Sequence, residues 1–282
     1  MVENRPFLTF LTHLVLMAGV VIVVFPVYLA LIASTHGPGQ FVSGLVPLLP
    51  GPHMIENYSV IWNEGLSSSG APPIWVMMMN SLVMAIAIAV GKIMISLLSA
   101  YAIVYFKFPF RLLAFWIIFI TLMLPVEVRI IPTFKVVADL GMLNSYQGLI
   151  LPLIASATAT FLFRQFFLTI PDELMEAARV DGAGPMKFFR DILLPLSRTN
   201  IAALFVILFI YGWVQYMWPL LVTSDSRYYT IVMGIKRLAA SADSEPLWHL
   251  VMAAVILAML PPVLIVIFMQ RLFVKGLVET EK

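Results

Sequence analysis

Charged side chains in this sequence are concentrated in one segment, residues 169–200 (the charged loop). Together with Arg164, just before it, this loop holds ten of the chain's 32 charged residues, although the chain as a whole is 61% hydrophobic. It lies between two apolar runs, each long enough to cross a bilayer. Side chains of both signs on a structured loop beside a membrane are typical of a docking surface for another protein.

No catalytic or metal-ligating pattern competes with that interpretation. The chain has no cysteine, and its four histidines are scattered, without an H-E-x-x-H or a His–carboxylate cluster. It also lacks the G-x-x-x-x-G-K-[ST] loop that cradles the phosphates of ATP. We therefore predict no catalytic residue, no metal and no cofactor in this chain; ATP with Mg²⁺ would bind a separate polypeptide.

The charged loop is predicted to fold as two short helices. Thr169 is placed to cap the first helix, and Pro171 fits its first turn, where a missing N–H costs little. Gly182 stands where a helix stop needs a left-handed residue. Pro185 then begins a second helix that runs towards Pro195.

The composition is that of an integral membrane protein. Only 11% of the residues are charged and the mean hydropathy is +0.99, whereas soluble domains carry about 25% charged residues. The net charge of +2, without a basic cluster, gives no indication of nucleic-acid binding. Apolar runs that can span a core of about 30 Å predict an all-α protein with six transmembrane helices: Leu11–Ser34, Met77–Phe106, Leu112–Ile131, Leu149–Phe167, Ile201–Val222 and Leu250–Phe273.

Basic residues predict the orientation of these spans. With the N-terminus in the cytoplasm, eleven of the seventeen Lys and Arg residues fall on the cytoplasmic side and five fall outside. We therefore expect a multi-pass protein of the bacterial inner membrane, with both termini and the charged loop in the cytoplasm. Prolines are expected to break the third span at Pro125 and Pro132, and to kink or break the sixth at Pro261-Pro262.

Lys92 lies deep in the second span, on the same helical face as a stripe of small residues. The stripe, formed by Ala85, Ala89, Ser96 and Ala100, allows transmembrane helices to pack closely. A lysine at this depth is costly and usually faces a bundle interior or an aqueous path. Two interpretations remain open: an electropositive element near the route of an anionic solute, or a structural donor to carbonyl groups or to a neighbouring subunit.

Three further polar side chains are candidates for a substrate path. Arg129 would either attract an anion at the outer mouth together with Lys135, or pair with Glu127 or with a partner protein. Gln215 and Tyr216, deep in the fifth span, would either hold a hydroxylated solute or belong to an aromatic belt at the membrane surface. Trp218, beside them, is assigned to that belt.

The motif Glu176-Ala-Ala-x-x-Asp-Gly-Ala183, followed by Ile192-Leu-Leu-Pro-Leu196, resembles the "EAA" loop of binding-protein-dependent ABC importer permeases. The resemblance implies a type I importer permease fold, in which this loop is a cytoplasmic coupling helix that inserts into a cleft of an ATPase. It also implies a first helix and periplasmic loop (1–75), a transmembrane domain (76–273) and a cytoplasmic tail (274–282). By that resemblance the ATPase-coupling residues are Glu176, Ala177, Ala178, Asp181, Gly182 and Ala183.

Other parts of the chain resemble a narrower group of these permeases. Asn80-Ser81 and Gln270-Arg271 look like the carbohydrate-type pattern, and residues 123–130, 156–167 and 213–220 look like the branch that serves sn-glycerol-3-phosphate importers. The implied working unit contains this permease, a homologous second permease, two ATP-binding subunits and a periplasmic solute-binding protein, assembled in membrane lipid.

The substrate stays open between sn-glycerol 3-phosphate, a related glycerophosphodiester, and a neutral sugar or oligosaccharide. An ion-coupled secondary transporter is disfavoured because the predicted spans lack Asp and Glu, except for Glu127 near one end. A membrane enzyme would need a catalytic constellation that the sequence does not show. Many permeases of the wider family have Asn where Val214 stands, which puts that position in doubt as a ligand.

Overall fold

The computed structural model describes residues 6–41, 47–65, 70–121, 126–240 and 247–278. The elements of regular secondary structure in these ranges are helices, as the apolar runs predict. The chain divides into two compact units, the first formed by Met1–Trp75 with Gly234–Leu260 and the second by Val76–Met233 with Pro261–Lys282. The predicted division at residues 75 and 273 stays a prediction.

The first unit joins two helices through a buried asparagine. It contains α1 (Pro6–Ala33), the 3-10 turn η1 (Pro38–Phe41), α2 (Met54–Asn63) and parts of α13 (Ile231–Ala239) and α14 (Trp248–Val278). Asn57 of α2 donates from Nδ2 to the carbonyl oxygens of Ser34 and His36, both at 2.8 Å. These bonds fix the chain that leaves α1 against α2. The rest of α1 exposes its apolar side chains, which suits contact with lipid or with another membrane subunit.

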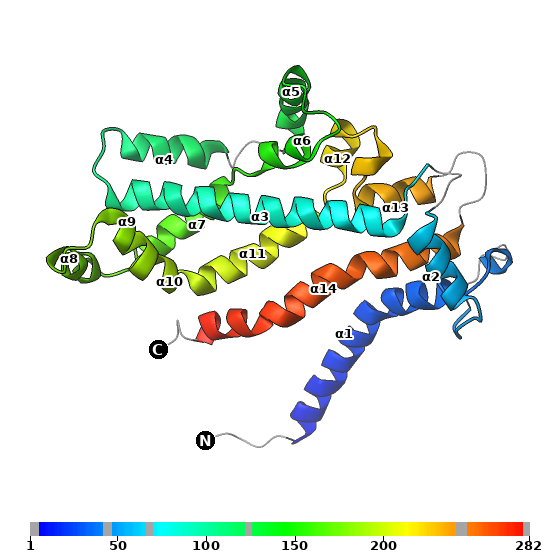
Figure 1. The fold of residues 1–282 in the computed structure, drawn as a ribbon. Coiled ribbons are helices and arrows are strands. Elements are labelled where there is room, and N and C mark those ends of the chain that lie inside the picture. The colour runs from blue at the N-terminus through cyan, green and yellow to red at the C-terminus, as the bar shows by residue number, and fades with distance from the viewer. Residues whose placement is uncertain (1–5, 42–46, 66–69, 122–125, 241–246, 279–282) are drawn as a thin grey trace. The chain divides into compact units, whose positions relative to one another are not determined.

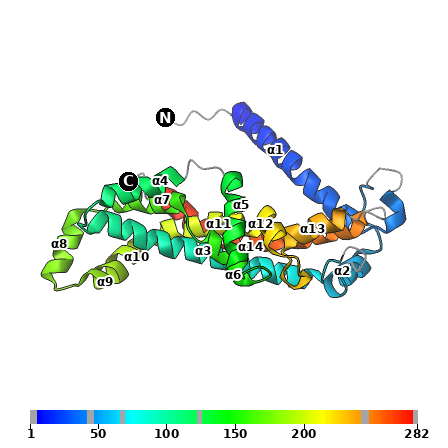
Figure 2. The same cartoon turned by 90° about the horizontal axis from the view of Figure 1, so that it is seen from above.

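The second unit is built along one long helix, α3 (Ile74–Tyr105). In Figures 1 and 2, α8 and α9 lie at one end of α3, and α5, α6 and α12 lie towards the other. Its remaining elements are α4 (Arg111–Ile120), α5 (Val126–Asp139), α6 (Tyr146–Ile150), η4 (Leu151–Leu153), α7 (Ala157–Phe167), α8 (Asp172–Val180), α9 (Pro185–Phe188), η5 (Phe189–Leu193), α10 (Leu194–Leu196), α11 (Arg198–Trp213), α12 (Met217–Val222) and η6 (Ser226–Tyr228).

The small residues of α3 make a close helix contact, as their spacing predicts. Ala85, Ala89, Ser96 and Ala100 are all fully buried. At Gly212 of α11, an added β-carbon would lie only 2.8 Å from the Ala85 α-carbon. The two backbones therefore meet directly, which only small residues on both helices permit.

A cluster of buried side chains joins α3 to α5, α6 and α12. Trp218 of α12 is 3% exposed, and its indole Nε1 donates to the carbonyl oxygen of Gly148 at 3.1 Å. The assignment of Trp218 to a surface aromatic belt is therefore wrong: the ring fills the core, and the short α6 supplies the acceptor that a buried indole needs. The cluster consists of Met84, Ile88, Val137, Leu149, Trp218 and Val222.

Three described helices are long and apolar enough to cross a membrane: Phe7–Ala33, Ile74–Tyr105 and Trp248–Gln270. Two bent pairs would raise the number to five: Tyr146–Leu153 with Ala157–Phe167, at 45°, and Pro185–Leu196 with Arg198–Trp213, at 71°. The predicted third span covers α4, which is ten residues long, and the start of α5. Residues 122–125, between these two helices, lie outside the described ranges. The count of six spans therefore stays a prediction.

Prolines interrupt the helices less than expected. Pro132 lies inside α5, so the break predicted there is wrong. Pro261 and Pro262 lie inside α14 and do not end it, and the kink that was the alternative to a break there stays a prediction. A proline removes one N–H bond to the preceding turn but leaves φ close to its helical value, and the neighbouring bonds carry the helix onwards. Pro125 lies outside the described residues. The predicted fifth span is instead interrupted at residues 214–216, where α11 ends and α12 has yet to begin.

Candidate functional site

The first helix of the charged loop, α8, begins directly after a proline. Pro171 occupies the N-cap position with extended backbone angles, and Asp172 and Glu173 stand in the first turn, near the positive end of the helix dipole. The predicted cap at Thr169 is wrong: its hydroxyl donates to the carbonyl oxygen of Phe166 at 2.7 Å. Thr169 therefore closes α7 and does not open α8.

The end of α8 is a Schellman turn centred on Gly182. The Ala183 N–H donates to the Ala178 carbonyl oxygen at 2.8 Å, and the Gly182 N–H donates to the Arg179 carbonyl oxygen at 3.0 Å. Gly182 has a φ of 74°, in the left-handed region that glycine adopts without strain. The predicted helix stop is confirmed, and it turns the chain sharply towards α9.

The second half of the loop is one helical segment with a π-helical turn in it. Pro185 begins α9 as predicted, and η5, from Phe189 to Leu193, widens to π-helix before α10. Phe188 and Leu193 are buried, so this segment is held by its apolar side. Its charged side faces outwards, where Arg190 Nε lies 2.7 Å from the Asp191 carboxylate.

Two tyrosines at the end of α3 anchor the charged loop. The Tyr101 hydroxyl donates to the Pro185 carbonyl oxygen at 2.8 Å, and its ring centroid lies 5.0 Å from that of Phe189. The Tyr105 ring lies 5.4 Å from the Phe188 ring, in an edge-on contact. Sequence reasoning missed this pair, although two tyrosines four residues apart at the end of an apolar run offer one polar and one apolar contact each. The loop is thus attached rigidly to α3.

A cavity of about 1080 Å³ opens between α8 and the end of α3. Three cationic side chains and two carboxylates contribute to its lining: Lys107, Arg111, Arg179, Asp172 and Glu176. Arg164 is partly buried, and its guanidinium carbon lies 4.2 Å from the centroid of the Phe115 ring in α4.

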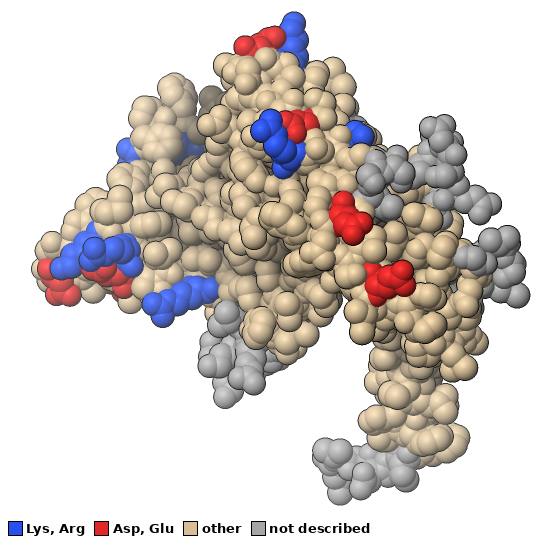
Figure 3. Space-filling view, turned by 45° about the vertical axis from the view of Figure 1, so that its right-hand side comes forward, with Lys and Arg blue, Asp and Glu red and all other residues tan. Residues whose placement is uncertain are grey.

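The six candidate coupling residues, in α8 and the turn after it, differ in their exposure. Glu176, Ala177, Asp181 and Gly182 are exposed, and Ala183 is partly buried. Ala178 is only 5% exposed and lines the cavity, so it packs against its own chain. Charged side chains gather in a few groups on the face drawn in Figure 3, and one group, at its left edge, lies where Figure 1 places α8 and α9. The exposed part of the loop therefore includes the acidic side of α8 and the turn that follows it.

Lys92 is buried in the interior of the second unit, 7% exposed. Its ammonium lies 3.8 Å from the centroid of the Tyr211 ring in α11. Gln215, one turn further on, donates from Nε2 to the Tyr211 carbonyl oxygen at 3.1 Å. The structure thus brings Lys92 and Gln215 to the same residue of α11, which their separation in the sequence does not predict.

The other two candidates for a substrate path are less enclosed. Arg129, in α5, is exposed but lies close enough to Lys92 for its charge to act on it. Tyr216 is partly buried at the break between α11 and α12. The alternative pairing of Arg129 with Glu127 falls on a side chain outside the described part of the chain.

Comparison with known proteins now decides the family. Residues 92–279 match the model of the family described as "Binding-protein-dependent transport system inner membrane component". This chain belongs to that family. It is similar over its full length to the permease protein UgpE of the sn-glycerol-3-phosphate transport system, with 59% identity to the protein of Agrobacterium fabrum and 58% to those of Brucella melitensis and Salmonella typhi, each covered completely.

The fold of this permease also has a solved counterpart. A chain from the crystal structure of a bacterial ABC transporter involved in the import of the acidic polysaccharide alginate superposes with a TM-score of 0.82. The match covers 96% of this chain and 98% of the other at 18% sequence identity. The ABC importer permease fold expected from the sequence is confirmed, and the protein is a membrane subunit of a transport system.

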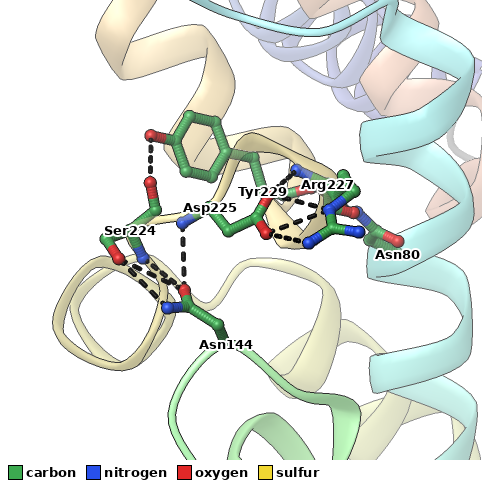
Figure 4. Close-up of polar contacts among 6 residues, drawn as sticks. All are labelled: Asn80, Asn144, Ser224, Asp225, Arg227 and Tyr229. Carbon is green, nitrogen blue, oxygen red and sulfur yellow. Dashed lines mark hydrogen bonds and ion pairs between the residues drawn. The ribbon is translucent and has the colours of Figure 1, made fainter.

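The permease also contains a polar cluster that sequence reasoning missed (Figure 4). Asn80, at the start of α3, donates from Nδ2 to the carbonyl oxygens of Arg227 and Tyr229, at 2.8 and 2.9 Å. Asn144, with a left-handed φ of 52°, accepts on Oδ1 from the backbone N–H groups of Ser224 and Asp225 at 2.7 and 2.9 Å. Two side-chain amides thereby fix the segment after α12 to α3 and to the α5–α6 turn. Asparagine after a glycine-stopped helix is the signal that could have found the second contact.

Within this cluster, Asp225 and Arg227 form an exposed ion pair. The Arg227 Nη2 lies 2.6 Å from the Asp225 carboxylate. Hydrogen bonds from the Arg227 side chain and backbone hold the pKa of Asp225 below its usual value. Because both side chains reach solvent, the pair sets the shape of the segment more than the stability of the fold.

Proposed function

We propose that this permease is the transmembrane subunit of an ATP-driven importer that carries sn-glycerol 3-phosphate across the bacterial inner membrane. The observation that supports the substrate most directly is the full-length identity of 58–59% to permeases named for sn-glycerol-3-phosphate transport. A neutral sugar is the second candidate, because the charged loop and the fold are common to importers of many solutes, and a glycerophosphodiester is a variant of the first.

The charged loop is proposed to be the coupling element. Glu176 would contact a basic residue of a separate ATPase, Ala177 would fit its cleft, and Gly182 would set the turn that shapes the docking surface. The rigid attachment through Tyr101 and Tyr105 supports this role, because it would pass a movement of the loop directly to α3. ATP could drive transport only by binding more tightly to one conformation of the assembly than to the other.

The complete assembly is proposed to contain a homologous second permease, two ATPase subunits and a periplasmic solute-binding protein, with both termini of this chain in the cytoplasm. The absence of native cysteine makes the orientation easy to test. Val180→Cys, at the last residue of α8, and Leu140→Cys, just after α5, change residues that are 87% and 66% exposed. A membrane-impermeant maleimide applied to spheroplasts should label only Leu140→Cys, and both after lysis. Labelling of Val180→Cys in intact spheroplasts would contradict the orientation.

The substrate is tested by transport in proteoliposomes that hold the whole importer. Uptake of labelled sn-glycerol 3-phosphate should require ATP and binding protein, and an excess of unlabelled sn-glycerol 3-phosphate should abolish it while maltose does not compete. ATP-dependent uptake of maltose but not of the phosphate ester would replace the proposed substrate by a sugar. Accumulation driven by an ion gradient without the ATPase would refute the importer mechanism.

A further inference from the structure

The position of Lys92 is not explained by coupling to an ATPase. It stands 18 residues after the start of α3 and 13 before its end, at least about 20 Å from either end of the helix. A lysine side chain cannot carry its ammonium that far to a membrane surface. The charge is therefore held inside the protein, where a lysine is costly and usually serves a solute or ion path.

No side chain in the described part of the chain compensates the charge of Lys92. Among the ion pairs formed by described side chains, none involves Lys92. Its close partner is the Tyr211 ring, 3.8 Å away, and a cation–π contact offsets only part of the cost of removing an ammonium from water. Among the described side chains, the charge that acts on the Lys92 ammonium is positive, from Arg129. This region consequently has a positive potential that an anion would relieve.

The backbone next to Tyr211 is interrupted within the predicted fifth span. The helix stops at Trp213 and resumes at Met217, two residues after Gln215. Interrupted helices at membrane depth are tolerated where they are buried in protein or line a cavity, and they often form binding sites in transporters. The Gln215 amide, bonded to the Tyr211 carbonyl oxygen, lies beside this interruption.

We propose that Lys92, held over the Tyr211 ring and reinforced by Arg129, is the residue of the permease that selects a doubly charged phosphate monoester during translocation. The ammonium rests on the ring when the path is empty and binds the phosphate oxygens when solute passes. This inference rests on the proposed function, because it assumes a phosphate ester as the solute. It assigns to the permease a share of the selectivity, in addition to that of a binding protein.

The experiment measures ATP-driven turnover of sn-glycerol 3-phosphate by the reconstituted importer at saturating solute, at pH 5 and pH 7.5. The second ionisation of a phosphate monoester lies near pH 6, so the solute changes from mostly monoanion to mostly dianion. Turnover of Lys92→Met is divided by wild-type turnover at each pH, which cancels the pH dependence of the ATPase. Lys92→Arg retains the charge, and Lys107→Met makes the same chemical change on an exposed lysine just beyond the end of α3.

The proposal predicts that the Lys92→Met ratio falls about tenfold between pH 5 and pH 7.5, that Lys92→Arg stays close to wild type, and that Lys107→Met gives the same ratio at both pH values. If Lys92 only holds α3 against α11, its replacement lowers turnover by the same factor at both pH values, and the proposal is overturned. Unchanged turnover of Lys92→Met also overturns it. Failure of the wild-type importer to carry the phosphate ester refutes the proposed function instead, and with it the ground for this inference.

Discussion

Gly182 offers the sharpest test of the charged loop as a coupling element. An added β-carbon at Gly182 would meet no atom within 4 Å, so a steric clash cannot explain any effect of Gly182→Ala. The cost comes from the backbone alone, because φ at Gly182 is 74° and alanine disfavours that region. The substitution therefore strains the Schellman turn and leaves the packing of the loop unchanged.

The magnitude follows from the backbone preference. A residue with a β-carbon pays about 1–2 kcal/mol in the left-handed region, and about 1.4 kcal/mol corresponds to a factor of ten in an equilibrium. The equilibrium constant between the native turn and its alternative conformations should fall by about 5- to 30-fold. If the ATPase recognises that turn, the apparent affinity of the permease for the ATPase falls by up to the same factor, while insertion into the membrane is unaffected.

The loop contains its own matched control in Gly184. An added β-carbon at Gly184 also meets no atom within 4 Å, but its φ of −70° suits any residue. Binding of detergent-solubilised permease to the immobilised ATPase, and ATP-driven uptake, should both fall for Gly182→Ala and stay at the wild-type level for Gly184→Ala. Gly182→Asn should recover part of the loss, since asparagine tolerates this region. Equal behaviour of the two alanine variants would refute the reasoning.

Three further predictions concern stability. Trp218→Ala should lower the free energy of unfolding by about 3–5 kcal/mol, measured by thermal melting in detergent, and a loss below about 1 kcal/mol would contradict its place in the core. Gly212→Ala should lower the melting temperature because its β-carbon would meet α3 at 2.8 Å, whereas Gly19→Ala, with open space, should not. Since Arg227 lowers the pKa of Asp225, the pair supports its segment above the unfolded-state pKa of about 3.9 and loses that effect as pH falls through the lower folded-state value. Protease resistance of the segment should therefore differ between wild type and Asp225→Asn at neutral pH, and this difference should disappear in stronger acid; a difference that persists there would contradict the assignment.

Local backbone requirements were predictable from the sequence. Gly182 and Pro185 were placed correctly because a left-handed stop and a helical first turn each have a strong residue preference. The small stripe of α3 was also predictable, since its spacing defines one helical face and close packing in membranes needs small residues.

The positions of several side chains depend on tertiary contacts, which local sequence patterns do not specify. Thr169 fits the usual sequence pattern of a helix cap, but its hydroxyl instead donates to the Phe166 carbonyl oxygen at the end of α7. Trp218 is a residue type typical of an aromatic belt at a membrane surface. Its burial depends on a tertiary contact with the Gly148 carbonyl oxygen, seventy residues away in the chain, which accepts the indole N–H. The approach of Lys92 to Tyr211 likewise depends on how α3 crosses α11, which no local pattern specifies.

α3 is uninterrupted between Asn80 and Tyr105, so this part of the helix can move as one rigid rod. Measured along the helix axis from Tyr101, which contacts the charged loop, Lys92 lies about 14 Å away and Asn80 about 32 Å away. If α3 tilted by about 10° about Tyr101, Lys92 would move by roughly 2 Å and Asn80 by roughly 5 Å, without any change inside the helix. A small rotation at the charged loop would thus move Asn80, at the far end of α3, further than it moves the buried Lys92.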